Sequence, residues 1–196
     1  MTGYLMNSPL LFETLEDLSQ AGYIQLLDVI PAGPSLLDAF SQYHCKLYLP
    51  GCIDALMGLR IGEDDTPQKL QHDLHQALGL YADSGVKLDV LLLWDLPNYL
   101  ANPVLLALIK YLLPFTSESA RLHCYIYTCQ QMPASPATYQ FAATEKIWVE
   151  SESEQTMPAP VLYQEALHRL LAPFVVQRSI LLSNGLQEYV LRKQPR

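Results

Sequence analysis

Short apolar runs alternate along this chain with segments in which apolar residues recur at helical spacing. The strongest run is Lys87–Trp94 (KLDVLLLW), a helix is expected from Asn102-Pro103 to about Leu113, and Arg121–Thr128 (RLHCYIYT) is the next run. Strands buried on both faces have nearly continuous apolar sequences, and their alternation with helices is typical of a parallel sheet covered on both sides. We therefore expect an α/β fold with a doubly wound, mostly parallel sheet.

The same two patterns place the other elements. We expect strands at Tyr23–Val29 and Cys45–Leu49, and helices over Pro9–Ala21, Ser35–Gln42, Thr66-Pro67 to Ser84-Gly85, and Pro160–Leu171. The chain ends with two β-rich runs, VVQRSILL and LQEYVLRK, on either side of an Asn184-Gly185 turn, which predicts an antiparallel hairpin that closes the sheet.

The 196 residues are interpreted as a single domain spanning 1–196, because neither a linker nor a repeat divides them. Within it we expect an N-terminal helical segment over residues 1–22. Residues 129–160 are expected to form an irregular insertion or lid, with a hairpin in TYQFAATEKIWVE.

Charge and composition exclude several classes of function. The formal net charge is −8 and the basic residues are scattered, which argues against nucleic-acid binding and against attraction to anionic lipid. The chain has neither a signal-peptide pattern nor the ~20 continuous apolar residues of a membrane span. Its four cysteines include no CxxC pair, so we expect reduced thiols and a cytoplasmic protein. His72 and His75 lack a third positioned ligand, so no metal site is predicted.

The order of elements resembles the class I S-adenosylmethionine-dependent methyltransferase fold over roughly Pro9 to Lys193. The resemblance rests on VLLLWDLPNYL (residues 90–100, preceded by Asp89), on RLHCYIYT and on the terminal hairpin. It implies S-adenosylmethionine as the cofactor. The residues that would bind this cofactor are Asp28, Gly33 and Trp94, and the candidates for positioning a methyl acceptor are Asp95, Asn98 and Tyr99.

The chain departs from the family at the turn after its first core strand. Asp28 fills the family's acidic place, but Ile30, Ala32 and Pro34 stand where glycines are expected, and only Gly33 remains. A Cβ at each of these places pushes the backbone away from a cofactor, and proline also lacks an N–H donor.

Two further departures concern the next strand. Leu49-Pro50-Gly51 stands where the family places a carboxylate for the ribose, and Asp54 comes about a turn too late. About a dozen residues separate Gly51 from the Thr66 helix, too few for a helix and a third strand, so we expect one strand–helix unit to be missing.

These departures predict a cofactor-deficient, methyltransferase-like pseudoenzyme that acts as a scaffold, regulator or interaction subunit and forms homo-oligomers or binds a protein partner. An alternative is a divergent but active S-adenosylmethionine-dependent methyltransferase, and a third is a binder of another small metabolite in the same crevice. The competing interpretation gives the site residues structural roles. Asp28 would then be a helix-capping carboxylate, and residues 94–99 a loop in which Asp95 and Asn98 accept hydrogen bonds from backbone N–H groups while Trp94 packs.

Overall fold

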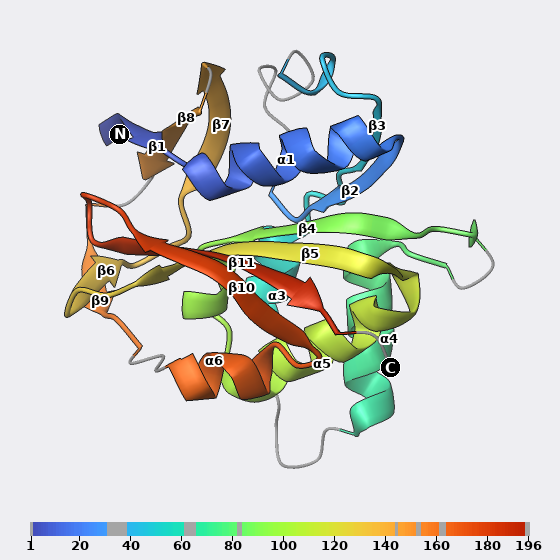
Figure 1. Cartoon of the computed structure of the whole chain (residues 1–196). Coiled ribbons are helices and arrows are strands. Elements are labelled where there is room, and N and C mark those ends of the chain that lie inside the picture. Colours follow the sequence, from blue (N-terminus) through green and yellow to red (C-terminus); the bar gives the residue numbers. More distant parts are fainter. Residues whose placement is uncertain are drawn as a thin grey trace.

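A six-stranded sheet forms the centre of the computed structural model, with the strand order β10-β11-β5-β4-β2-β3 (Figure 1). The structure describes residues 2–30, 39–60, 66–81, 84–143, 145–151, 154–160 and 164–194. The strands of this sheet are β2 (Ile24–Asp28), β3 (Cys45–Tyr48), β4 (Leu88–Trp94), β5 (Thr116–Tyr127), β10 (Phe174–Leu181) and β11 (Leu186–Lys193). Neighbouring strands from β3 to β5 pair in parallel, whereas β11 pairs antiparallel with both β5 and β10. The predicted mostly parallel sheet with a C-terminal antiparallel hairpin is confirmed.

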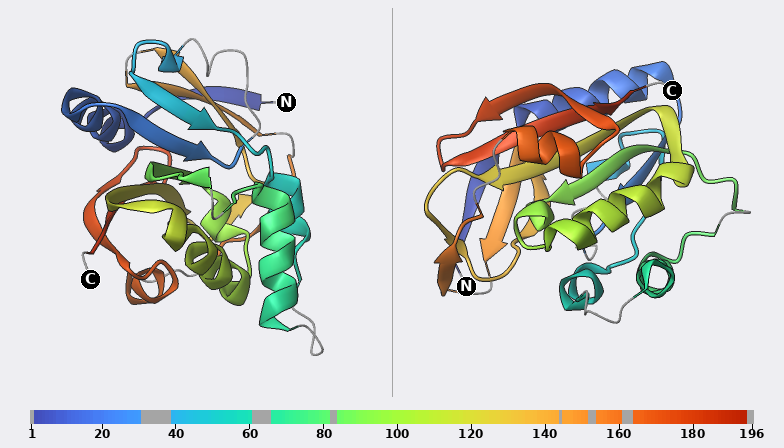
Figure 2. Two further views of the ribbon diagram at one scale, coloured as in Figure 1. Left: turned by 90° about the vertical axis from the view of Figure 1, so that its right-hand side faces the viewer. Right: turned by 90° about the horizontal axis from the view of Figure 1, so that it is seen from below.

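Helices cover both faces of the sheet (Figures 1 and 2). Helix α1 lies on one face, and α3, α4, α5 and α6 lie on the other. Their bounds are α1 Pro9–Ala21, α3 Ile53–Gly58, α4 Pro67–Leu78, α5 Asn102–Leu112 and α6 Gln164–Leu170, and the short 3₁₀ turns are η2 (Leu96–Asn98) and η3 (Leu113–Phe115).

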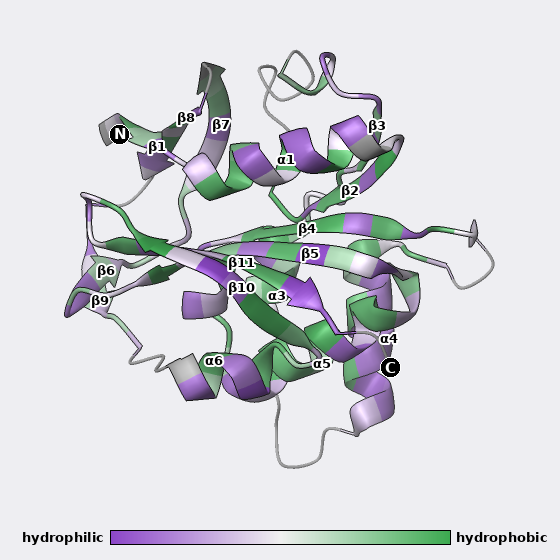
Figure 3. Ribbon diagram, viewed as in Figure 1, coloured by the Kyte–Doolittle hydropathy of each residue, from purple (hydrophilic) through white to green (hydrophobic). Residues whose placement is uncertain are grey.

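Burial explains why the central strands have apolar sequences. In β4 every residue except the half-buried Asp89 is buried, because helices or the insertion strands cover both of its faces. The ribbon coloured by hydropathy shows β4 mostly hydrophobic, whereas α4 contains many hydrophilic residues (Figure 3). The two elements differ in hydropathy because a central strand is covered on both faces, whereas a surface helix exposes one face to solvent.

Helix α4 begins as predicted and ends earlier. The Thr66 hydroxyl caps its first turn by accepting a hydrogen bond from the Lys69 N–H at 3.3 Å. The helix ends at Leu78, because Gly79 adopts a left-handed conformation with φ 62°. The prediction that Ser84-Gly85 ends this helix was therefore wrong.

Beyond β3, the described residues add no further strand to the sheet. The chain passes from β3 through the short helix α3 to α4, as expected from the short interval after Gly51. No helix among the described segments is both long and apolar enough to cross a bilayer.

The N-terminal segment and the insertion form small sheets at one end of the molecule (Figure 1). One sheet has the order β1-β8-β7 and the other pairs β6 with β9. The strands are β1 (Thr2–Asn7), β6 (Gln131–Pro133), β7 (Thr138–Ala143), β8 (Lys146–Ser151) and β9 (Thr156–Pro158). The helical assignment of residues 1–22 was therefore wrong for β1, and the segment 129–160 is more regular than predicted, although its hairpin is confirmed.

Candidate functional site

The carboxyl ends of β2 and β4 bring Asp28 and Trp94 together. The two strands are parallel neighbours, with Asp28 in register with Leu92. The indole Nε1 of Trp94 donates a hydrogen bond to Asp28 Oδ1 at 2.7 Å, and the Ile30 N–H donates to the same oxygen at 3.0 Å. Asp28 is only 2% exposed. The carboxyl that the resemblance assigns to a cofactor is thus bound inside the protein.

Burial also changes the charge of this carboxyl. Desolvation raises the pKa of Asp28 to about 7, even though the hydrogen bonds from Trp94 and Ile30 oppose the rise. Near neutral pH the group is therefore protonated in a large fraction of molecules. A carboxyl in this state is a weak partner for the ammonium group of an amino-acid ligand.

Aromatic side chains from the insertion cover Trp94. The Tyr139 ring of β7 stacks on the indole with centroids 4.7 Å apart and an interplanar angle of 9°, and Phe141 packs against it edge-on at 6.1 Å. Trp94 is fully buried and has φ 51°, a backbone conformation that is uncommon for a residue with a side chain. The insertion strand β7 therefore fills the space at the carboxyl end of β4.

The next predicted site residues, Asp95 and Asn98, also bond within the protein, except for Asp95 Oδ1, which has no hydrogen-bond partner among the described residues. Burial raises the pKa of the Asp95 carboxyl to about 7, and its Oδ2 accepts the Ala137 N–H at 3.2 Å. Asn98 donates from Nδ2 to the carbonyls of Asp95 and Tyr125 at 2.7 and 2.8 Å, and its Oδ1 accepts the Tyr127 N–H at 3.0 Å. The Asn98 side chain thus joins η2 to the end of β5.

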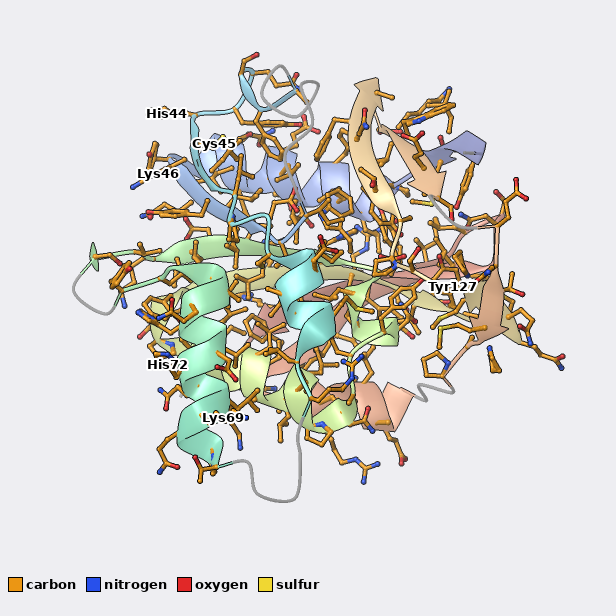
Figure 4. The ribbon with its side chains drawn as sticks, turned by 180° about the vertical axis from the view of Figure 1, so that it is seen from behind. His44, Cys45, Lys46, Lys69, His72 and Tyr127 are labelled. Atoms are coloured by element: carbon orange, nitrogen blue, oxygen red, sulfur yellow. The ribbon has the colours of Figure 1, made fainter. Side chains whose placement is uncertain are left out.

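Tyr99 binds the insertion rather than an open crevice. Its hydroxyl lies 3.1 Å from the Pro133 carbonyl oxygen and 3.0 Å from that of Ser135, and shares its proton between them. Tyr127, at the end of β5, lies at the insertion end of the molecule, away from Lys69 and His72 on α4 (Figure 4).

Six residues were predicted for this site. The structure brings Asp28 and Trp94 into contact and places Asp95, Asn98 and Tyr99 after β4, whereas Gly33 lies outside the described residues.

A buried polar network next to this cluster was not predicted. Glu188 of β11 is fully buried, and its Oε1 accepts hydrogen bonds from the Ser8 hydroxyl at 2.6 Å and the Leu11 N–H at 3.0 Å. The His123 Nε2 lies 3.0 Å from the same oxygen, and the Tyr125 hydroxyl lies 2.6 Å from Ser8 Oγ. The carboxylate thus caps the first turn of α1, where exposed N–H groups favour negative charge.

The charge of Glu188 follows from these partners. Burial alone would raise its pKa, but the hydrogen bond and charge of His123, with the Ser8 and Leu11 hydrogen bonds, lower it overall. The network contains a serine, a histidine and a carboxylate, but Ser8 Oγ bonds the carboxylate rather than the imidazole, and all three residues are at most 1% exposed. This arrangement lacks the base-activated, accessible hydroxyl of a hydrolase.

A sequence signal for this network exists in β11. Its alternation places Leu186, Glu188 and Val190 on one face, so that a carboxylate stands in a core-facing position. A charged group there requires buried partners. The described residues contain no group of three or more side chains suited to hold a metal ion.

The strand order and terminal hairpin resemble the class I S-adenosylmethionine-dependent methyltransferase fold. The sequence matches no protein-family model and no curated protein. Solved structures with a similar fold include the 1,6-didemethyltoxoflavin-N1-methyltransferase of Burkholderia thailandensis, which contains bound S-adenosylhomocysteine. This likeness has 13% identity, a TM-score of 0.46, and coverage of 93% of this chain and 76% of that one.

Two further structures give similar values. PH0226 from Pyrococcus horikoshii OT3 has 13% identity and a TM-score of 0.47, with 95% of this chain and 91% of that chain covered. TrmN from Thermus thermophilus has 14% identity and a TM-score of 0.43, with 94% and 48% covered. Likenesses of this size concern the backbone alone and say nothing about ligand or activity.

Proposed function

We propose that this chain is a methyltransferase-like protein that does not use S-adenosylmethionine and acts through protein contacts, as a scaffold or regulatory subunit. The observation that carries the proposal is the 2.7 Å hydrogen bond from Trp94 to Asp28, both of them buried at the carboxyl ends of adjacent strands. The oxygen that would meet a cofactor already accepts an indole N–H and a backbone N–H.

The surroundings of this pair support the same conclusion. Tyr139 and Phe141 cover the indole, and the polar groups of Asn98 and Tyr99 bond to the protein itself. A ligand entering here would have to break these hydrogen bonds and displace stacked rings, and each buried polar group left unpaired costs about 1–3 kcal/mol. Preorganised cofactor sites avoid this cost by presenting free groups.

A second departure from the family favours the proposal. Strand β3 ends at Tyr48, and the first carboxylate beyond it is Asp54, an exposed residue in the first turn of α3. The edge of the sheet that would meet the adenosine ribose therefore presents no strand-end carboxylate. Most of the turn after β2, in which other residues replace the family's glycines, falls in residues 31–38, outside the described residues. Its role in excluding a cofactor stays a prediction.

The partner that we propose is a second copy of this chain. β10 is one of the two edge strands of the central sheet, eight residues long with neither lysine nor proline, and Ile180 and Leu181 at its end are 41% and 61% exposed. Beside them, Tyr4 and Leu5 of β1 are 43% and 55% exposed and line a groove of about 510 Å³ shared with the end of β10. A bulge just before Arg178 and the charge of that residue protect the first part of this edge, so its exposed apolar end at Ile180 and Leu181 is the part that favours pairing with another strand.

Calorimetric titration with S-adenosylmethionine and S-adenosylhomocysteine tests the loss of cofactor binding. We expect no saturable heat and no thermal stabilisation up to about 1 mM ligand, whereas functional sites bind with a Kd on the order of micromolar. A micromolar Kd that is lost in Asp28→Ala but kept in Asp54→Ala would refute the proposal and favour the divergent, active methyltransferase.

Light scattering after size-exclusion chromatography tests the partner. We expect a dimer that dissociates in Leu181→Lys, because a buried lysine opposes edge pairing, while Tyr81→Lys, at a residue 63% exposed elsewhere, leaves the mass unchanged. A monomer at all concentrations would exclude self-association.

A further inference from the structure

A surface cavity of about 600 Å³ lies at the end of the sheet opposite Asp28 and Trp94. Its lining comes from the last turn of α5, η3 and several strand ends: the residue before β4, the start of β5, the residue before β10 and the end of β11. These strand ends meet at one end of the sheet because β11 runs antiparallel to β5 and β10. This volume falls within the ~300–1,000 Å³ typical of small-molecule sites. The proposed function leaves this cavity unused.

Positive charge is concentrated in this cavity. The chain is acidic, with a formal net charge of −8. Its lysines are Lys46, Lys69, Lys87, Lys110, Lys146 and Lys193. Lys87, Lys110 and Lys193 all line the cavity, and Glu118 is the one acidic residue of the lining. The lining thus has a net positive charge in a protein that is negative as a whole.

Hydrogen bonds hold two of these ammonium groups, one at Thr116 at the start of β5 and one at Pro114 in η3. Lys193 Nζ donates to Thr116 Oγ1 at 2.9 Å and to the Thr116 carbonyl at 3.3 Å, and Lys87 Nζ lies 3.5 Å from the Pro114 carbonyl oxygen. The Pro114 carbonyl is neutral and leaves the positive charge of Lys87 in place. Lys110 extends from the last turn of α5, and within the described part of the chain neither Lys87 nor Lys110 forms an ion pair.

We propose that this cavity binds a small molecule through a phosphate or diphosphate group, with Lys87 and Lys110 as its cationic partners. Lysine ammonium groups act as point charges that bind phosphate oxygens. Two ammonium groups in one lining that form no ion pair among the described residues suit a ligand with at least two negative charges, because a monocarboxylate would neutralise only one of them. Binding at this end leaves the aromatic cluster at the other end untouched, so the inference is independent of the proposed function.

Calorimetry of the full chain with inorganic pyrophosphate tests this site. In ~50 mM salt we expect one saturable site with a Kd below about 1 mM that weakens steeply at ~0.5 M salt, since screening reduces the attraction. A second titration with adenosine diphosphate separates two sources of the same chemistry. Tighter binding than pyrophosphate indicates a nucleotide, and equal binding indicates recognition of the anion alone.

Matched variants place the binding in the cavity. Lys87→Gln/Lys110→Gln should weaken pyrophosphate binding at least tenfold, whereas Lys46→Gln/Lys146→Gln removes the same charge elsewhere and should change it less than twofold. Chemical-shift mapping gives a second measurement on the unaltered chain, with the largest changes expected at Thr116, Glu118 and Lys193. The proposal is overturned by the absence of saturable binding up to ~10 mM, by equal weakening in both double variants, or by shifts that cluster elsewhere.

Discussion

Replacing Asp28 with asparagine should flatten the pH dependence of stability. Asp28 is buried, and its Oδ1 accepts hydrogen bonds from Trp94 Nε1 and the Ile30 N–H. An asparagine Oδ1 can accept both bonds, and the amide stays neutral at every pH. The substitution therefore removes an ionisation while it keeps the contacts that hold β2 to β4.

The magnitude follows from the pKa of Asp28, which burial raises from the ordinary 3.8 to about 7. Between these values the unfolded chain releases a proton that the folded chain keeps, so stability is greatest in acid and falls as the pH rises toward 7. A pKa difference of about three corresponds to ~4 kcal/mol, of which about 2.5 kcal/mol falls between pH 5 and pH 8. Asp28→Asn should avoid this loss.

Urea unfolding followed by circular dichroism at several pH values between 5 and 8 measures the effect. We expect the free energy of unfolding of Asp28→Asn to rise relative to the unaltered chain by about 2–3 kcal/mol across this interval. Asp95 remains in both proteins, so its own raised pKa cancels in the difference. Asp54→Asn, at an exposed carboxylate, is the control. Parallel pH profiles for Asp28→Asn and the unaltered chain would refute the argument, because they would mean that Asp28 ionises normally in the folded state.

Three other substitutions test the packing around the site. Glu188→Gln should destabilise the fold by ~1–3 kcal/mol at pH 7, because a neutral amide oxygen accepts the Leu11 N–H and bonds His123 more weakly than the carboxylate does. The lowered pKa of Glu188 gives this difference the opposite pH sign, so that it shrinks in acid urea titrations. Gly3→Ala places a Cβ against the indole of Trp148, so a cost of ~1 kcal/mol and a red-shifted tryptophan emission are expected; an unchanged spectrum would contradict this contact. Tyr99→Phe removes a hydroxyl that bonds two carbonyls of the insertion, which should cost ~1 kcal/mol and speed amide exchange in residues 131–137 but not in β4.

The fold could be predicted wherever the sequence pattern is local. The apolar run of β4, the Thr66-Pro67 start of α4 and the Asn184-Gly185 turn each specify an element within a few residues. Strand β1 could not be predicted in this way, because its six residues become a strand by pairing with β8, more than a hundred positions later. The end of α4 was misplaced because Gly79 precedes two more apolar residues, Leu80 and Tyr81, that continue the helical pattern.

At the candidate site, too, local features could be predicted from the sequence and long-range contacts could not. The place of Asp28 at the end of β2 follows from its position after an apolar run, but its hydrogen bond to Trp94 joins residues that are 66 positions apart. The stacking of Tyr139 on that indole depends on how the insertion folds back over β4, which no local pattern specifies. Sequence reasoning could thus place Asp28 and Trp94 at the ends of neighbouring strands but could not show that they bond to each other.

The buried rings also bear on whether the insertion acts as a lid. Trp94, Tyr139 and Phe141 are 0%, 3% and 6% exposed, and aromatic side chains bury ~150–250 Å² each. At about 25 cal/mol per Å², opening this cluster to water would cost on the order of 10 kcal/mol as an upper estimate, comparable with the net stability of a typical domain. A lid that opens in each catalytic cycle must have a far smaller cost, since such segments belong to the least stable parts of a protein. The strand β7 is therefore better understood as part of the core, and a cofactor would have to compete with the folding of the insertion itself.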